Sequence, residues 1–347
     1  MTPPLRDQFP AGTGYLAACT MGLPPANARR AITADLEVWA TGLATTTGYE
    51  VAVARSRAAF ARLVHVDPAR VAIGSQVSVQ ASVIAAAAPD GAEVLCPRGD
   101  FSSIAAPFAQ QARRGVRVRE VPLEALADAV TDETWLVAFA LVQSASGRVA
   151  DADAVLEAAA RHGARTLVDL TQAAGWLDFD AGRADATVTH AYKWLCAPRG
   201  ASLMTLSTSL QAELTPVQAG WYAGDDIWAS CYGPDVALAS DARRFDVSPA
   251  WQAWVGAAEA LELFAAADVA GIRSHGVGLA DELCTALRLP AADSAIVTWA
   301  DPDGRAVRAM TDAGLTVSGR AGNARVAFHA WNDEHDVARI VDVLRRR

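Results

Sequence analysis

Short apolar runs alternate with Ala-rich amphipathic stretches through the middle of the chain. Strands are predicted for the apolar, mostly β-branched runs at 92–96, 116–121, 135–142, 165–170, 186–189 and 202–206. Helical patterns lie between several of them, at 77–88, 104–114 and 152–161. The strands are apolar at nearly every position, which is typical of a parallel sheet covered by helices on both faces. The central region therefore predicts an α/β domain.

The pattern changes after Pro249. Later elements are predicted as helices at 250–267, 268–287, 303–313 and 333–346 and strands at 294–299 and 324–330. This alternation is typical of a smaller α+β unit. We expect a large domain over 15–249 and a small domain made of 1–14 and 250–347.

Composition and charge narrow the class of protein. The 347 residues carry a net charge of -9, so the surface repels nucleic acid and anionic membranes, and neither is expected as a partner. The five cysteines include no CxxC pair, which argues against a zinc cluster or a disulfide framework and favours a reducing compartment. No apolar run approaches the ~18 residues of a membrane span, and the N-terminus lacks a signal-peptide pattern. We expect a soluble, cytoplasmic protein without a metal site.

The only lysine of the chain, Lys193, follows a predicted strand, whereas every other one of the 30 basic residues is arginine. Asp169 ends a buried strand upstream, and a carboxylate leaving an apolar strand needs a cationic or donor partner. A strand-terminal Asp followed about two dozen residues later by a strand-terminal Lys is the pattern that pyridoxal 5'-phosphate requires. The lysine forms the Schiff base, and the carboxylate keeps the pyridine nitrogen protonated.

These segments resemble the class V aminotransferase family of fold-type-I pyridoxal phosphate enzymes. The resemblance runs from YLAACTMGLPP to RVAFHAWNDEHDVARIVDVL, nearly the whole chain. It implies a large domain with a mostly parallel seven-stranded sheet and a smaller α+β C-terminal domain. It also implies that Asp169 contacts the pyridine nitrogen, that Gln172 lies near the phenolic oxygen, and that Lys193 is the Schiff-base lysine.

The same resemblance implies a phosphate site in the segment IGSQVSVQ, which opens a predicted helix. Backbone N–H groups at a helix N-terminus suit a dianion. Ser75 and Gln76 would hold the phosphate, with Gly74 permitting close approach. The family often has a phosphate-binding Ser or Thr three residues before the lysine, so His190 or Thr189 would substitute for it here. Tyr192 resembles the tyrosine of the kynureninase-type Tyr-Lys pair.

Further site residues also follow from the resemblance. Phe101 would stack on the cofactor ring, and Ser144 would lie close to the phenolic oxygen. Trp221, in AGWYAGDDIW, resembles a tryptophan that reaches a phosphate. Ser248, in RRFDVSPAW, would touch the phosphate in a neighbouring subunit, so that a homodimer shares its active sites. Arg325 would bind the α-carboxylate of an amino-acid substrate, because Arg offers a bidentate fork.

The reaction is the least determined part of this interpretation. A desulfurase needs a cysteine shortly before the carboxylate-binding arginine, and 303–324 contains none, with Met310 near the expected place. This favours a C–S β-lyase that converts a cysteine S-conjugate or its sulfoxide to pyruvate, ammonia and a sulfur product. Hercynylcysteine sulfoxide is a specific candidate, because aromatic residues between Trp221 and Trp254 could form a cage for its trimethylammonium group or could simply pack a core or an interface. An isopenicillin-N-epimerase-like epimerase, a kynureninase-like hydrolase and a non-catalytic binding protein stay open as alternatives.

Overall fold

A seven-stranded sheet with the strand order β1-β7-β6-β5-β4-β2-β3 forms the centre of the chain. It is described here from a computed structural model that covers residues 5–291 and 293–346. The strands of this sheet are β1 (Val71–Gly74), β2 (Glu93–Pro97), β3 (Arg117–Val121), β4 (Thr134–Ala140), β5 (Arg165–Asp169), β6 (Ala186–His190) and β7 (Ser202–Leu206).

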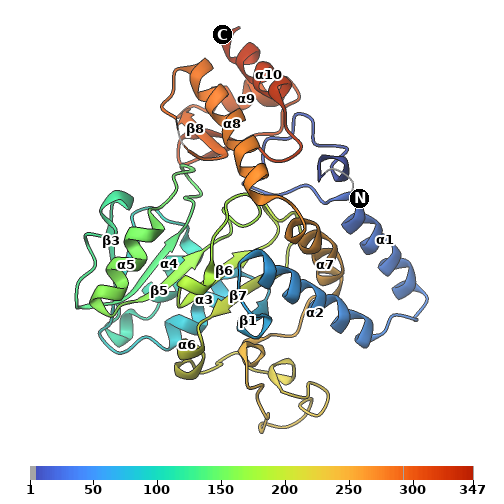
Figure 1. Cartoon of the computed structure of the whole chain (residues 1–347), viewed down its shortest axis with the longest axis vertical. Coiled ribbons are helices and arrows are strands. Elements are labelled where there is room, and N and C mark those ends of the chain that lie inside the picture. Colours follow the sequence, from blue (N-terminus) through green and yellow to red (C-terminus); the bar gives the residue numbers. More distant parts are fainter. Residues whose placement is uncertain (1–4, 292, 347) are drawn as a thin grey trace.

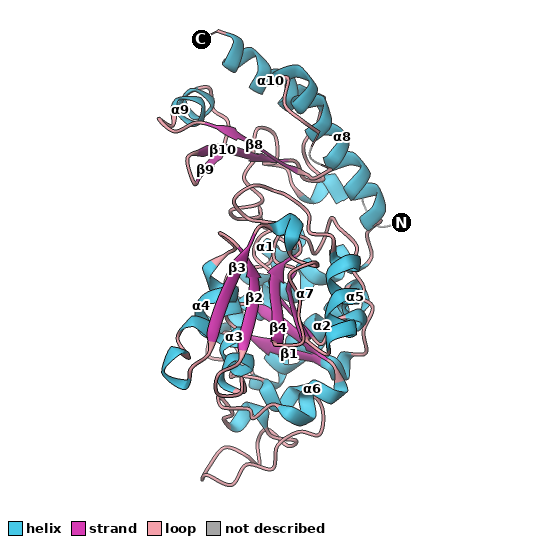
Figure 2. Cartoon of the chain, turned by 90° about the vertical axis from the view of Figure 1, so that its left-hand side faces the viewer, coloured by secondary structure: helices cyan, strands magenta, loops and turns pink. Residues whose placement is uncertain are grey.

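The sheet is mostly parallel, as the sequence predicts. Strands β3, β2, β4, β5 and β6 run parallel to one another, whereas β7 is antiparallel to β6 and to β1. The carboxyl ends of the five parallel strands therefore meet at one edge, which is where ligands bind in open α/β sheets. Figure 2 shows the strands of this sheet side by side beneath the separate C-terminal unit.

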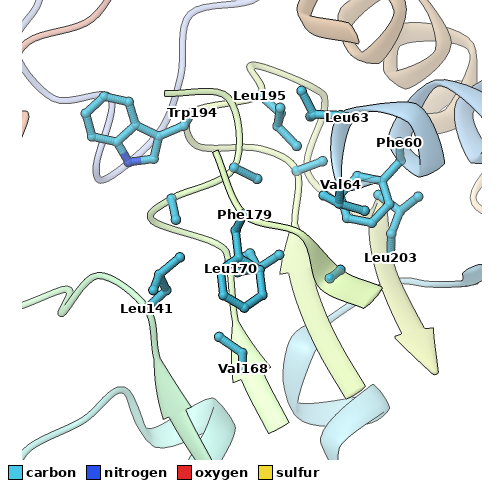
Figure 3. Close-up of a cluster of buried hydrophobic side chains, with 14 of the residues drawn as sticks. Phe60, Leu63, Val64, Leu141, Val168, Leu170, Phe179, Trp194, Leu195 and Leu203 are labelled. Atoms are coloured by element: carbon cyan, nitrogen blue, oxygen red, sulfur yellow. The ribbon is translucent and has the colours of Figure 1, made fainter. Parts of the chain in front are cut away.

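Helices cover both faces of the sheet, and each face has its own apolar core. The helices are α1 (Ala26–Ala40), α2 (Thr46–Leu63), α3 (Val77–Ala86), α4 (Ser102–Ala109), α5 (Ala152–His162), α6 (Thr208–Glu213), α7 (Trp251–Ala265), α8 (Val269–Leu287), α9 (Arg305–Asp312) and α10 (Glu334–Arg345). Helices α3 and α4 pack on one face with residues such as Ala72, Val188 and Met204. Helices α2, α5 and α7 pack on the other, around the buried side chains drawn in Figure 3.

A second, three-stranded sheet lies in the C-terminal part, which forms the upper part of Figure 1. It pairs β10 (Asn323–Ala327) antiparallel with β8 (Ile296–Ala300) and β9 (Ser318–Arg320). Helices α8, α9 and α10 complete its core. The N-terminal segment adds parallel bridges at Tyr15↔Thr316 and Ala17↔Ala327, so both ends of the chain contribute to this unit.

The structure confirms the fold class and all of the predicted strands and helices, with ends that differ by a few residues. The proposed division at 249/250 stays a prediction, and the first four residues of its 1–14 segment lie outside the described residues. Helix α7 packs against α1 and α2, in the core of the large sheet. Across the described part of the chain, no helix has the length and hydropathy to cross a membrane.

Candidate active site

A pocket of about 610 Å³ lies at the carboxyl edge of the parallel strands. Residues following β4, β5 and β6 meet there with the N-termini of α3 and α4. Eight of the residues predicted from the sequence line this pocket: Gln76, Phe101, Ser144, Asp169, Gln172, His190, Tyr192 and Lys193. Segments separated by more than a hundred residues are thus brought together by the parallel topology of the sheet.

Lys193 stands in the turn after β6, and only 5% of it is exposed. Its Nζ lies 5.2 Å from the ring centroid of Phe101 and 5.9 Å from that of Tyr192. Burial lowers the pKa of Lys193 to about 8, against an opposing contribution from the carboxylate of Asp169. A neutral, nucleophilic amine is therefore accessible near physiological pH.

Asp169 is the last residue of β5 and is 4% exposed. Burial raises its pKa to about 6, although the backbone N–H of Thr171 donates a hydrogen bond to its Oδ1 at 2.8 Å. Within the described chain no cation lies within ion-pair distance of this carboxylate. The site thus holds a buried acid that a protonated ring nitrogen would neutralise.

Gln172 connects three parts of the site through its amide. Its Nε2 donates to the carbonyl oxygen of Cys19 at 2.9 Å and to Ser144 Oγ at 3.1 Å. The indole Nε1 of Trp194 donates to Gln172 Oε1 at 2.8 Å, which fixes the orientation of the amide. Because Ser144 Oγ accepts from Gln172, its own O–H is available to an acceptor in the pocket.

Arg325 lies on β10 and does not line the pocket, but its guanidinium contacts the pocket wall at Ser144. Its Nη1 donates to the carbonyl and hydroxyl oxygens of Ser144, its Nη2 to Thr20 Oγ1 at 2.8 Å, and its Nε to Ser318 Oγ at 3.1 Å. Burial lowers the pKa of Arg325, and the strongest opposing influence comes from Cys19. The guanidinium of Arg325 is therefore held rigidly beside the pocket by neutral oxygens, and it has no carboxylate partner among the described residues.

The N-terminal segment that supplies Cys19 and Thr20 is the main part of the site that the sequence did not indicate. The backbone N–H of Gly22 donates to the carbonyl of Tyr192 at 2.8 Å. A Cβ at Gly22 would collide with the carbonyl of Lys193 and lie 2.8 Å from Cys196 Sγ, so only glycine allows this approach. The resemblance of YLAACTMGLPP to the family was a signal, but it attached no role to these residues.

Asp100 is a second residue that sequence reasoning missed. Its carboxylate accepts from the backbone N–H groups of Phe101 at 2.6 Å and of Ala140 at 2.8 Å. Burial raises the pKa of Asp100. The carboxylate thereby joins the loop after β2 to the end of β4 and places Phe101 over Lys193.

The N-terminus of α3 marks the opposite end of the pocket. Gln76 precedes the helix in an extended conformation and gives it no side-chain cap, and both Gln76 and Val77 line the pocket. His190 lies nearby, with its ring 4.4 Å from that of Tyr192 in an edge-to-face arrangement. Burial lowers the pKa of His190 to about 4, with further contributions from Arg199 and Lys193. Ser75, which the sequence analysis paired with Gln76, is not among the lining residues.

Trp221 and Ser248 also lie outside the lining of this pocket in the single chain. Trp221 packs against Tyr222 and Trp228, each with ring centroids 5.2 Å away. The other aromatic residues considered for a cage are dispersed: Trp251 stacks on Tyr49 at 4.9 Å, and Trp254 is buried in the core. The aromatic residues between Trp221 and Trp254 therefore do not form a single cage in this chain.

The pocket fits pyridoxal 5'-phosphate on its own chemistry. It has a buried amine with a lowered pKa, an aromatic ring beside that amine, and a buried carboxylate that makes no ion pair with the described residues. A helix N-terminus without a side-chain cap suits a phosphate at the other end. These four features are the ones that the aldehyde, ring, ring nitrogen and phosphate of this cofactor require.

Comparison with known proteins agrees with this assignment. The model of the family described as aminotransferase class-V matches residues 43–302, so the chain belongs to this family, whose enzymes depend on pyridoxal phosphate. An isopenicillin N epimerase of Streptomyces clavuligerus is 30% identical over 185 residues. That match covers 48% of this chain and 46% of the epimerase, so the chain spans about half the length of this relative.

Solved structures show the same fold over nearly the whole chain. The cysteine desulfurase CsdA from Escherichia coli superposes with a TM-score of 0.86 at 18% identity, covering 98% of this chain and 96% of CsdA. The cystine C-S lyase C-DES, in complex with cysteine persulfide, gives 0.85 at 22% identity, covering 96% of this chain and 99% of C-DES. At these identities the likeness establishes the fold and leaves the reaction open.

Proposed function

We propose that this chain is a pyridoxal phosphate-dependent C–S β-lyase acting on a cysteine S-conjugate or its sulfoxide. The observation that carries the proposal is the arrangement of Lys193, Asp169 and Arg325, combined with the lack of an exposed thiol on the segment before Arg325. Lys193 would hold the cofactor covalently, Asp169 would hold a proton on its ring nitrogen, and Phe101 would lie against its ring. When bound, the cofactor supplies an electron sink for negative charge that develops at the substrate Cα.

Arg325 would orient the substrate through its α-carboxylate. The four oxygens around the guanidinium hold its plane in place, so little side-chain entropy is lost when a carboxylate binds. Ser144, which bonds both Arg325 and Gln172, would donate its O–H to an oxygen in the pocket. The proposed site for the substrate carboxylate therefore lies beside the pocket wall at Ser144, close to where the reaction would take place.

Lys193 would become a free amine once the substrate amine has displaced it from the cofactor, and it would then remove the Cα proton. Its lowered pKa of about 8 gives a substantial fraction of neutral amine near neutral pH, as a general base needs. The Cβ–S bond breaks with its electron pair leaving on sulfur, and the resulting aminoacrylate hydrolyses to pyruvate and ammonia. This sequence uses no protein thiol.

The position of the cysteines supports elimination over desulfuration. Met310, near the place expected for a desulfurase cysteine, is fully buried in α9 within the C-terminal core. Cys19 is near the site but is 1% exposed, and its segment is fixed by the bond from Gln172 to its carbonyl oxygen. A sulfur-carrying cysteine must reach an external acceptor, and Cys19 has no such access in this chain.

The experiment is a substrate panel of cysteine S-conjugates and their sulfoxides, hercynylcysteine sulfoxide included, scored for pyruvate, ammonia, alanine and inversion at Cα. Pyruvate and ammonia in equal amounts support the lyase. Formation of alanine together with a persulfide on the protein would instead support a cysteine desulfurase. Inversion without pyruvate would support an epimerase, the activity named for the relative that is 30% identical.

The proposal includes a homodimer with shared active sites. Trp228 and Tyr232, on the long segment after α6, are 47% and 93% exposed, which is unusual for large aromatic side chains in a single chain. Ser248 and Trp221 would reach a cofactor phosphate only in such an assembly. Sedimentation analysis of the cofactor-loaded protein tests this, and an active monomer would contradict it.

A further inference from the structure

A row of buried polar side chains lies on the sheet face that α3 covers. Among the described residues, Gln80 Nε2 and Oε1, Ser202 Oγ and His190 Nε2 are buried without a hydrogen-bond partner. Gln80 is 4% exposed, Ser202 0% and His190 8%. Buried polar groups in native proteins are almost always hydrogen-bonded, so a concentration of four unpartnered atoms requires a ligand.

The strand register places these side chains next to one another. His190 of β6 stands opposite Ser202 of β7, and Ser202 stands opposite Gly74 of β1. Residues directly opposite in antiparallel strands point to the same face of the sheet. At Gly74 the space of the missing side chain is filled from α3, because a Cβ there would lie 2.9 Å from Gln80 Nε2. The order along the row is therefore Gln80, Ser202, His190.

Gly74 has a structural role in this packing. Close approach of a phosphate at Gly74, as the family resemblance implies, stays a prediction. In the structure the glycine makes room for the amide of Gln80.

The row formed by Gln80, Ser202 and His190 suits bridging by water molecules. These side chains make no direct hydrogen bond to one another through the atoms named above, which suits one bridging molecule between neighbours. A buried water needs two to four polar partners, which this row provides. We infer that bound water bridges Gln80, Ser202 and His190, and that this bridge fixes the proton of His190 on the ring nitrogen that faces the pocket.

The imidazole of His190 can carry its proton on either ring nitrogen, and its surroundings favour Nδ1. Burial and the nearby cations of Arg199 and Lys193 lower the pKa of His190 to about 4, so the ring is neutral at pH 7 and carries one N–H. His190 lines the pocket while its Nε2 is buried, so Nδ1 is the nitrogen offered to a ligand. The amide N–H of Gln80 and the hydroxyl of Ser202 can donate to a bridging water, and an O–H of that water can then donate to Nε2 of His190. The proton is then held on Nδ1, where it donates to an anion.

Gln80 and Ser202 are thus positioning residues for the phosphate end of the pocket, where Gln76 and Val77 start α3. This step rests on the cofactor placement in the proposed function. Its distinctive consequence concerns the phosphate alone. The row should favour pyridoxal 5'-phosphate over pyridoxal, which lacks the phosphate, and should not affect how either compound reacts with Lys193.

The test compares dissociation constants for pyridoxal 5'-phosphate and pyridoxal in wild type, Gln80→Met and Ser202→Ala. Losing a hydrogen bond to a charged acceptor should weaken binding of the phosphorylated compound about 10- to 100-fold. Pyridoxal binding should stay within about two-fold of wild type by the same reasoning. Thr187→Val is the matched control, because Thr187 lies on the same strand with its buried hydroxyl bonded to Thr205 at 2.8 Å, away from the pocket. It should change neither constant.

A second measurement does not depend on affinity. Selective ¹⁵N labelling of the six histidines in the cofactor-loaded wild type should show the Nδ1–H tautomer for His190, assigned with His190→Gln. Gln80→Met should shift most of the His190 rings to the Nε2–H tautomer, because a 10-fold loss of phosphate binding requires that only about a tenth of them keep the Nδ1–H form. An Nε2–H tautomer in wild type, or an unchanged preference for the phosphorylated compound in both folded variants, overturns the inference. Failure of wild type to bind either compound would overturn the proposed function as well, so the two failures are distinguishable.

Discussion

Asp169→Asn should stabilise the cofactor-free protein while it disables the enzyme. Asp169 is buried and makes no ion pair with the described residues, and burial raises its pKa from 3.8 to about 6 although the nearby charge of Lys193 lowers it. At about 1.4 kcal/mol per pKa unit, this shift costs the folded state roughly 3 kcal/mol at pH 8. Asparagine keeps the shape and the acceptor for the N–H of Thr171 without the charge.

The sign of the pH dependence follows from proton linkage. Because the folded state holds this proton more tightly than the unfolded state, stability falls as pH rises from 3.8 to about 6 and is level above that range. The advantage of Asp169→Asn should therefore be largest at pH 8 and about half as large at pH 5. Asp169 also raises the pKa of Lys193, because the two charges attract each other. Asp169→Asn loses this attraction, so we expect the free energy of unfolding to increase by roughly 1–3 kcal/mol in total at pH 8.

Urea unfolding of the cofactor-free proteins at both pH values measures this effect. Asp246→Asn provides the contrast, because Asp246 is equally buried but bonds Arg57 at 2.6 Å. Removing one member of a buried ion pair destabilises by about 3–5 kcal/mol. With cofactor, Asp169→Asn should lose turnover by orders of magnitude. Equal or lower stability of cofactor-free Asp169→Asn at pH 8, or wild-type turnover when loaded, would refute the reasoning.

Three further predictions concern the remaining site residues. Borohydride treatment of the loaded protein should attach the cofactor irreversibly at Lys193 alone, as mass mapping can show, and Lys193→Arg should give a folded protein without the adduct. Arg325→Ala should raise KM about 30- to 4,000-fold and leave the cofactor absorbance unchanged, with partial rescue by Arg325→Lys; normal amino-acid binding would place the carboxylate site elsewhere. Replacing all five cysteines should keep turnover within a few-fold, and loss of activity in Cys19→Ala alone, with unchanged absorbance, would return the desulfurase assignment.

The sequence predicted the parallel strands and the residues at their ends well, because buried strands are marked by unbroken apolar runs. It could not predict β1, whose four residues are too few to show a period, or α1, in which only Ala28 is buried. Asp169 and Lys193 could be predicted because their type and position at strand ends are themselves chemical signals, whereas Gln172 was predicted from the family resemblance alone. Cys19, Thr20 and Asp100 act through backbone groups or through another side chain, and such roles leave no pattern in one sequence.

The bridges from Tyr15 and Ala17 to Thr316 and Ala327 set an order on how this enzyme can be assembled. Thr20, which accepts a hydrogen bond from Arg325, precedes that arginine of β10 by 305 residues in the chain. Such long-range pairing closes slowly and late in folding. The pocket can therefore gather its sheet-edge residues before β10 has been synthesised, whereas Arg325, the proposed ligand of a substrate carboxylate, joins it only afterwards. A nascent or truncated chain would hold cofactor without turning over substrate.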